Sequence, residues 1–305
     1  MKKAGCYICG SANYRLITTK SKYRIVKCRK CDFVFTTPTP NRKEIEEFYR
    51  KFDYKDSLLA EQVIRSDAKR SLKKISYYVT EKGELLDVGC GRGYLLDEAR
   101  KLGWKTHGVD ASKLVTDYAK DTLHLNVFCS DIFSFRPAQA FDLIILNQVI
   151  EHFVNPEELI NQCGKHLVKG GLLYIATPNV ESVNARVLKD NFDHYIPPEH
   201  LSYFSQRTLK RLLEKLGFKV LYVGSWSYPS DLGGIIKTLL GKKVQPKQSS
   251  QLLNKNQGAT PYSSMRFNVK QVKSFLFDQV FCHLFNNVLS FDCWGINLEV
   301  LAIKL

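Results

Sequence analysis

The chain has 305 residues, of which 44% are hydrophobic, enough for a main domain with one or two smaller modules. No apolar run reaches the length of a membrane span and the first residues lack the apolar core of a signal peptide, so the sequence predicts a cytoplasmic protein. The net charge of +15 favours anionic partners such as nucleic acid, nucleotide-linked sugars, phosphorylated lipid carriers or membrane lipid, and a generally basic surface with no particular partner is the alternative.

The nine cysteines argue against a disulfide framework, because the number is odd and four of them form two C-x-x-C pairs. The pairs are separated by 18 residues, a spacing typical of a four-cysteine zinc ribbon. Four thiolates leave no open coordination position, so the zinc is predicted to be structural; a redox dithiol pair is the alternative. The stretches 14–17 and 23–26 predict a hairpin within a ribbon that occupies residues 1–40. The predicted ligands are Cys6, Cys9, Cys28 and Cys31.

Residues 41–80 are predicted to form a helical cap. The preceding stretch 36–40, rich in Thr and Pro, has the composition of a linker. Asn41 and Glu44 have the spacing of a capping box, which predicts a helix over 42–51. A second helix is predicted over 57–78, because apolar residues recur there at helical spacing, at Ile64, Ala68, Leu72, Ile75 and Val79.

From residue 81 to 226 the chain alternates strand patterns with helix patterns. Such alternation predicts an α/β fold with parallel strands and helices on both faces of the sheet. Ligands of these folds lie beyond the C-terminal ends of the strands. Strands are predicted near 84–88, 106–109, 126–128, 142–146, 172–176 and 218–224, and helices near 93–102, 112–121, 156–167 and 205–216.

The stretch 84–93 joins a strand pattern to a helix pattern through Gly89, Gly91 and Gly93. Glycine permits a sharp turn and a close approach of the backbone to a ligand. A dinucleotide fingerprint would have the spacing G-x-G-x-x-G and would place a pyrophosphate on the helix N-terminus. Here the spacing is G-x-G-x-G and Asp87 lies just upstream, where a carboxylate would repel a pyrophosphate. A cationic ligand without phosphate, such as S-adenosylmethionine (SAM), suits this carboxylate.

The stretch 86–93 resembles the first motif of the class I SAM-dependent methyltransferases. Four later stretches resemble the family's following motifs in the same order, at 106–110, 129–131, 141–147 and 168–175. This resemblance covers roughly residues 80–226 and the last strand, and it implies a Rossmann-like seven-stranded sheet whose last strand is antiparallel. It also implies the SAM contacts: Asp87 and Gly89 at the methionine end, Gly91 and Gly93 in the turn, Asp110 at the ribose hydroxyls, Ser130 and Asp131 at the adenine, and Asn147 and Gln148 near the methyl group.

Two histidines are candidate catalytic residues. His152 lies in a run that is common in the family, where a structural role at the helix start is the alternative. His200 lies in the stretch 197–205, which resembles the active-site segment of deoxysugar C-methyltransferases, enzymes that also carry an N-terminal four-cysteine zinc module. That resemblance implies His200 as the base, with Glu199 and Tyr203 as helpers. The same run occurs in ubiquinone-type O-methyltransferases and in enzymes that act on glycans, where the histidine orients the acceptor.

Residues 227–290 interrupt the pattern and are predicted to be an insertion that covers the substrate. A Phe-rich helix is predicted over 269–289, either packed in the core or lying on a membrane surface as a peripheral contact. The alternating stretch 291–305 resembles the family's last strand. We expect no room in this chain for the second large domain that the sugar enzymes carry.

Three functions are compatible with these observations. The first is a methyltransferase acting on a small-molecule or glycan-linked acceptor, nucleotide- or lipid-linked in some forms, with a sugar hydroxyl or carbon as the preferred target. The second is an RNA or protein methyltransferase that uses the ribbon and the basic surface for grip. Nucleic acid is disfavoured, because the basic residues are not clustered with aromatics and the family's nucleic-acid tetrapeptide is replaced by 147–150. The third is a non-catalytic SAM-binding scaffold. The sequence predicts no oligomeric state.

Overall fold

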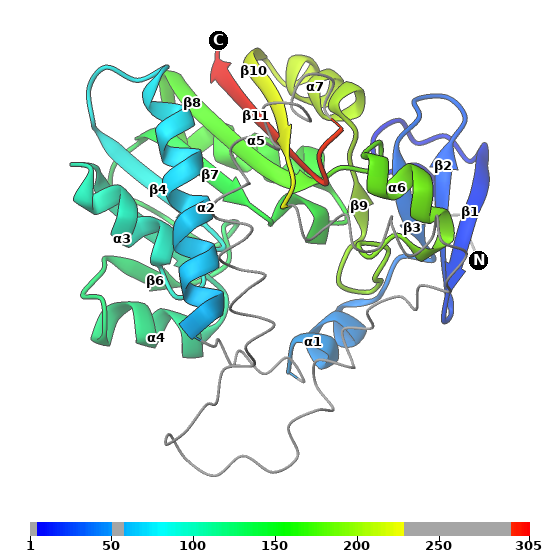
Figure 1. The fold of residues 1–305 in the computed structure, drawn as a ribbon, viewed down its shortest axis with the longest axis horizontal. Coiled ribbons are helices and arrows are strands. Elements are labelled where there is room, and N and C mark those ends of the chain that lie inside the picture. The colour runs from blue at the N-terminus through cyan, green and yellow to red at the C-terminus, as the bar shows by residue number, and fades with distance from the viewer. Residues whose placement is uncertain (1–4, 51–57, 229–293) are drawn as a thin grey trace. The chain divides into compact units, whose positions relative to one another are not determined.

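The computed structural model describes residues 5–50, 58–228 and 294–305 (Figure 1). The chain divides into two compact units, each assembled from separate stretches. The first unit contains Met1–Asp53, Pro178–Thr208 and Gly224–Leu298, and the second contains Tyr54–Thr177, Leu209–Val223 and Glu299–Leu305. The sequence predicts one domain over 81–226, whereas the structure groups 178–208 with the ribbon.

The second unit is built on a seven-stranded sheet of order β10-β11-β8-β7-β4-β5-β6. The five strands from β6 to β8 are parallel to their neighbours. Strand β11, the red arrow between β10 and β8 in Figure 1, is antiparallel to both. The C-terminal end of β11 lies beside the first residues of the other two strands: Leu305 N–H donates to Gly217 O (3.0 Å) and Lys304 Nζ donates to Leu167 O (2.8 Å). The predicted sheet and its antiparallel last strand are therefore confirmed. The strands are β4 (Glu84–Val88), β5 (Lys105–Asp110), β6 (Val127–Cys129), β7 (Phe141–Asn147), β8 (Leu167–Pro178), β10 (Phe218–Trp226) and β11 (Asn297–Lys304).

Helices supply the apolar cover of this sheet. The helices are α2 (Leu58–Ser76), α3 (Tyr94–Lys101), α4 (Lys113–Asp121), α5 (Pro156–His166) and α7 (Gln206–Lys215). Ala68, Leu72 and Ile75 of α2 lie in one core with residues of α3, α4 and the sheet, as their helical spacing predicted, whereas Ile64 is 37% exposed. An ion pair of 2.7 Å joins Lys215 of α7 to Glu157 of α5.

Helix α2 is fixed to the second unit by two groups of buried charges. Arg65 donates to Asp97 and Glu98 of α3, at 2.7 Å each, and these two carboxylates are 5% and 6% exposed. Arg70 donates to the buried Glu299 of β11 at 2.6 Å, and the Tyr174 hydroxyl donates to the same carboxylate oxygen at 2.9 Å. Burial raises the pKa of Glu299, but Arg70 and the hydroxyl donors outweigh it, so the net pKa lies below the usual value.

The first unit contains a four-stranded antiparallel sheet of order β1-β2-β3-β9. Strands β1 (Tyr14–Lys20) and β2 (Tyr23–Cys28) form the predicted hairpin, but β3 (Val34–Thr37) and β9 (Ser202–Tyr203) were not predicted. The proposed linker at 36–40 was wrong in its first half: Thr36 and Thr37 are buried and pair with β2. Threonine is β-branched and suits a strand, and here the partners across the sheet outweigh the turn-like composition.

Three further helical segments belong to the first unit: α1 (Arg42–Arg50), α6 (Val183–Leu188) and the 3₁₀ turn η2 (Lys189–Asn191). The predicted capping box begins α1, since Glu44 N–H donates to Asn41 Oδ1 and Asn41 N–H donates to Glu44 Oε2, both at 2.9 Å. Side chains of the ribbon strands, including Ile25 and Val34, share a core with Phe192 and Tyr203. This shared core explains why 178–208 belongs to the ribbon.

Most of the predicted insertion at 227–290, with its Phe-rich helix over 269–289, lies outside the described residues. Within the described ranges, no helix combines the length and the apolar character needed to cross a membrane.

Candidate functional site

The glycine-rich turn after β4 has the backbone geometry that its sequence predicts. Gly89, Gly91 and Gly93 all have positive φ, at 71°, 52° and 78°. A Cβ on Gly93 would lie 2.5 Å from a methyl group of Leu125, whereas a Cβ on Gly91 would meet nothing within 4 Å. The turn therefore requires glycine at its ends and leaves open space at its middle, where a ligand can approach the backbone.

Asp110 at the end of β5 holds this turn. Its Oδ2 accepts a hydrogen bond from Gly91 N–H at 2.9 Å, and its Oδ1 accepts one from Ser112 N–H at 2.8 Å. Burial raises the pKa of Asp110, and the two backbone donors offset part of that rise. Each carboxylate oxygen has a second lone-pair direction, so the group can still accept from a pair of ligand hydroxyls.

Asp87 at the end of β4 is 3% exposed. Among the described residues no hydrogen-bond donor contacts its carboxylate, and burial, followed by the charge of Asp110, raises its pKa well above the usual value. A buried carboxylate beside a second one, with no donor of its own, is costly unless a cation neutralises it. Asp87 therefore fits a cationic group that would bind above the glycine turn.

The end of β6 carries Ser130 and Asp131. The Asp131 carboxylate caps its own turn: Oδ1 accepts from Phe133 N–H and Ser134 N–H, both at 2.8 Å, and Oδ2 from the Ser134 hydroxyl at 3.0 Å. Burial raises the pKa of Asp131, but these donors outweigh it and the net pKa is lowered. The predicted adenine contact thus has a turn-forming role in the structure, with acceptor capacity left mainly on Oδ2.

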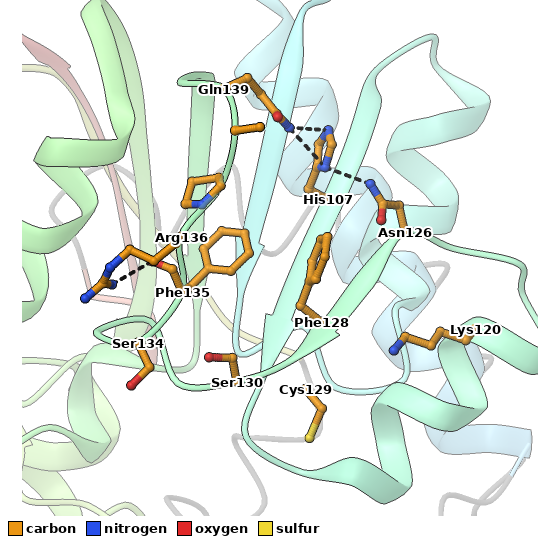
Figure 2. A pocket seen from close by; sticks show the side chains of 12 residues that line it. His107, Lys120, Asn126, Phe128, Cys129, Ser130, Ser134, Phe135, Arg136 and Gln139 are labelled. Carbon is orange, nitrogen blue, oxygen red and sulfur yellow. Dashed lines mark hydrogen bonds between the residues drawn. The ribbon is translucent and has the colours of Figure 1, made fainter.

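A cavity of about 630 Å³ runs along the outer edge of β6 and reaches Ser130 at one end (Figure 2). Phe128 and Phe135 lie near its middle, with ring centroids 5.4 Å apart. At the other end, His107 contacts Asn126 Nδ2 through Nδ1 at 2.9 Å and Glu84 through Nε2 at 2.6 Å. Ser130 is among the residues that line the cavity, whereas Asp87 and Asp110 are not, so these two predicted cofactor residues lie outside it.

The end of β7 brings together Asn147, Gln148 and His152. Gln148 has a φ of 56°, and its N–H donates to Ala176 O at 2.8 Å. His152 closes a 3₁₀ turn, η1 (Ile150–His152), and is partly exposed. The sequence analysis passed over Glu151, which is 1% exposed and accepts a hydrogen bond from the Thr177 hydroxyl at 2.9 Å. The sequence signal that could have identified Glu151 is its position next to His152 in the same run.

His200, Glu199 and Tyr203 belong to the first unit. His200 is 6% exposed, and its Nδ1 lies 3.1 Å from His194 O. A carbonyl oxygen can only accept, so Nδ1 carries the proton and Nε2 is the basic nitrogen of the neutral ring. The buried Tyr203 hydroxyl donates to His200 O at 2.7 Å, which makes it a backbone contact of the predicted base. Glu199 is partly exposed.

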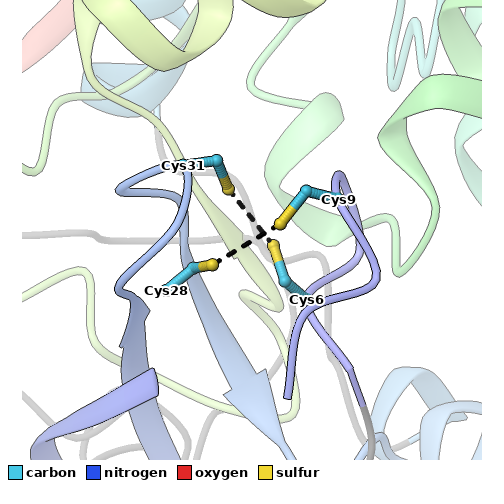
Figure 3. Close-up of side chains that lie close together, drawn as sticks. All are labelled: Cys6, Cys9, Cys28 and Cys31. Carbon is cyan, nitrogen blue, oxygen red and sulfur yellow. Dashed lines mark hydrogen bonds between the residues drawn. The ribbon is translucent and has the colours of Figure 1, made fainter. Parts of the chain in front are cut away.

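The four cysteines of the ribbon converge (Figure 3). Their Sγ atoms lie within 4.8 Å of one another, with 3.5 Å between Cys6 and Cys31 and between Cys9 and Cys28. These separations exclude disulfides, whose S–S distance is about 2.05 Å. They are close to the edge of roughly 3.8 Å that a tetrahedron with Zn–S bonds of about 2.3 Å requires. The set therefore fits a tetrahedral, thiolate-preferring metal ion.

Comparisons with known proteins agree with this geometry. The model of a family described as "Methyltransferase domain" matches residues 59–223. The Ubiquinone biosynthesis O-methyltransferase of Coxiella burnetii (strain Dugway 5J108-111) is 32% identical over 167 residues, which cover 48% of this chain and 71% of the relative. The protein of the same name from Caulobacter sp. (strain K31) is 34% identical over 110 residues, covering 31% of this chain and 40% of the relative.

Among solved structures, a SAM dependent methyltransferase from Archaeoglobus fulgidus superimposes with a TM-score of 0.51 and 20% sequence identity. The superposition covers 85% of this chain and 99% of that chain. At this identity the likeness shows a shared fold.

Proposed function

This chain belongs to the class I SAM-dependent methyltransferases, and we propose that it transfers the methyl group of SAM to a hydroxyl of a small-molecule acceptor. The observation that carries the proposal is the pair of carboxylates, the buried Asp87 and the half-buried Asp110, at the ends of two adjacent parallel strands around the glycine turn. This pair suits a ligand with a cationic end and a ribose, and it would repel a pyrophosphate.

When bound, SAM supplies a sulfonium-activated methyl group and a good leaving group. Asp87 would hold the cationic methionine end, and Asp110 would accept from the ribose hydroxyls while it keeps the turn in place. Gly89, Gly91 and Gly93 let the backbone approach closely. Asn147 and Gln148 would lie at the methyl end, and Ser130 and Asp131 at the adenine.

We propose His200 as the base that takes the acceptor proton at Nε2. The bond from Nδ1 to His194 O supports this role, because it fixes the tautomer in which Nε2 is basic. His152 and Glu199 are proposed to orient the acceptor. An alcohol or phenol needs such a proton acceptor when it attacks carbon, and the O-methyltransferase names of the relatives support oxygen as the target.

The names of the relatives favour a hydroxyl acceptor of the kind used in ubiquinone biosynthesis, and the sequence segment around His200 favours a sugar. Both present a hydroxyl. The finer proposal from the sequence, a sugar or glycan-linked acceptor, is kept as the second candidate for the same site.

The test is transfer of labelled methyl from SAM into a fractionated cell extract by the purified chain. Label in small phenolic compounds or in nucleotide-sugar, glycan or lipid-linked fractions supports the proposal and separates the two acceptor classes. Label confined to RNA or protein would overturn it. SAM binding without transfer to any fraction would favour a binding scaffold.

We also propose that Cys6, Cys9, Cys28 and Cys31 hold a structural Zn²⁺. All four sulfurs would be ligands, so no coordination position is left for a substrate. Elemental analysis of the purified chain should find about one zinc per chain. A chain that keeps its ribbon sheet after complete zinc removal would contradict the structural role.

A further inference from the structure

Thr36 connects the ribbon to the segment that contains His200. It lies in β3, its side chain is fully buried, and it is 164 residues away from His200 in the sequence. Its neighbours in β3 pair with β9 in antiparallel register, Val34 with Tyr203 and Phe35 with Ser202. Strand β3, which follows the second cysteine pair, therefore pairs with β9 of the segment that contains His200.

Three hydrogen bonds, two from Thr36 and one from Tyr203, fix the backbone at His200 and Leu201. Thr36 N–H donates to Leu201 O at 2.9 Å, and the Thr36 hydroxyl donates to His200 O at 3.2 Å. The Tyr203 hydroxyl donates to the same His200 carbonyl at 2.7 Å and lies 3.1 Å from the Thr36 hydroxyl. The His200 carbonyl is therefore held at one point by two buried hydroxyls.

The side chain of His200 is fixed on its other side by its own segment. Nδ1 donates to His194 O at 3.1 Å, and the two imidazole rings stack at 5.8 Å with an angle of 6° between their planes. The His200 ring is attached to the backbone that carries the His200 carbonyl, so a shift of the backbone moves the ring. The position of Nε2 therefore depends on the carbonyl contacts from Thr36 and Tyr203.

We propose that Thr36 is a positioning residue for the base. The ribbon then contributes to the acceptor site in addition to holding a metal ion. The inference rests on the proposed function, in which His200 is the base. On the His200 side, Thr36 contacts the backbone at His200 and Leu201 and the Tyr203 hydroxyl, so it acts through the His200 backbone. Its chemical contribution is a fixed orientation of the imidazole.

Two substitutions of Thr36 isolate the hydroxyl. Thr36→Val keeps the shape and removes the hydroxyl, and Thr36→Ser keeps the hydroxyl. Thr37→Val is the matched control, because Thr37 is 2% exposed in the same strand and its hydroxyl makes no hydrogen bond within the described part of the chain. Since misplacement of a catalytic group by about 1 Å can cost about 100-fold in rate, we expect Thr36→Val to lower kcat by roughly 10- to 100-fold.

The first readout needs no acceptor. The full chain, as purified and labelled with ¹⁵N-histidine, is compared by long-range ¹H–¹⁵N correlation, and His200 is assigned by the loss of its signal in His200→Gln. The parent, Thr36→Ser and Thr37→Val should show the Nδ1–H tautomer, whereas Thr36→Val should shift His200 towards an averaged tautomer signal. If Thr36→Val does not fold, Tyr203→Phe removes the other donor to the same carbonyl and should give the same shift.

The second readout is kinetic, with catechol and a nucleoside-diphosphate sugar as acceptor probes. Thr36→Val should lower kcat while the Kd for SAM stays at the parent value, and Thr36→Ser should restore kcat. A His200 spectrum and a kcat that match those of Thr37→Val would overturn the inference. If His200→Gln keeps full turnover while Thr36→Val still shifts the tautomer, the base role in the proposed function fails and the positioning by Thr36 stands.

Discussion

Asp87→Asn should stabilise the chain in the absence of cofactor. The carboxylate is 3% exposed, no donor among the described residues contacts it, and Asp110 adds a like charge. An unsatisfied buried polar group costs about 1–3 kcal/mol, and a charged one costs more. The amide is neutral but is also buried, so it recovers only part of this cost, and we expect a gain of about 1–2 kcal/mol in the free energy of unfolding.

The same substitution should weaken SAM binding. A hydrogen bond to a charged group contributes about 1.5–3 kcal/mol, so the Kd for SAM should rise by roughly 10- to 100-fold. The sign of the pH dependence follows from the raised pKa of Asp87 in the folded state. The penalty is complete at pH values above that folded-state pKa, shrinks as the pH falls below it, and disappears only below the ordinary carboxyl pKa of the unfolded chain. The stability difference between parent and variant should therefore shrink as the pH is lowered.

Thermal unfolding without ligand tests the stability prediction, and titration calorimetry with SAM tests the binding prediction, each over a range of pH. A gain of 1 kcal/mol corresponds to roughly 2–4 °C for a chain of this size class. Asp121→Asn is the control, because Asp121 is an exposed acid of the same unit and should change neither quantity. An Asp87→Asn variant that binds SAM as tightly as the parent would refute the assignment of Asp87 to the cationic end.

Three other substitutions, the first with a control, test the glycine turn, the buried carboxylate of β11 and the predicted metal site. Gly93→Ala should lower the free energy of unfolding by about 1–3 kcal/mol through crowding, in addition to the effect of backbone strain. The control Gly217→Ala, at a φ of 83° with nothing within 4 Å of the added Cβ, should show the effect of strain alone. Urea unfolding measures both. Tyr174→Phe removes a donor from the buried Glu299 and should lower the free energy of unfolding by about 1–3 kcal/mol; an unchanged urea midpoint would contradict this. Cys9→Ser should reduce zinc well below the parent's content in elemental analysis, and full retention would exclude Cys9 as a ligand.

The sequence was sufficient to predict the second unit because its signals are local. Strands such as β4, β7 and β8 contain apolar runs with flanking turns, and the alternation with helices predicts that the strands are parallel. The seven-stranded sheet with its antiparallel last strand was predicted from the resemblance to the methyltransferase family. The glycine turn was predictable in the same way, since positive φ at Gly89, Gly91 and Gly93 is what their spacing after a strand requires. Asp87 was predicted from its place beside the glycine turn and Asp110 from the resemblance to the family, and both lie at the ends of adjacent parallel strands.

The first unit depends on pairings between residues far apart in the sequence. Strand β3 contains only four residues, and β9 only two, so neither has a periodicity that could be recognised. Their pairing buries Thr36 and Thr37, whose composition with the following prolines resembles a linker. Asp131 shows a second limit: an acid after a strand can bind a ligand or cap its own turn, and only the coordinates reveal the donors of the turn.

The hydrogen bonds that fix the proposed SAM site and the proposed base come from different units. The glycine turn is held by Asp110 and by Val109 O, all within the second unit, whereas His200 is held by Thr36, Tyr203 and His194 O within the first. Substitutions in the first unit should therefore change turnover with little effect on SAM affinity. Because the Cys28–Cys31 turn directly precedes the strand that carries Thr36, loss of the metal should act in the same selective way. If the ribbon were only an accessory module, loss of the metal would not change turnover. The ratio of kcat to SAM affinity therefore distinguishes an accessory ribbon from one that positions the base.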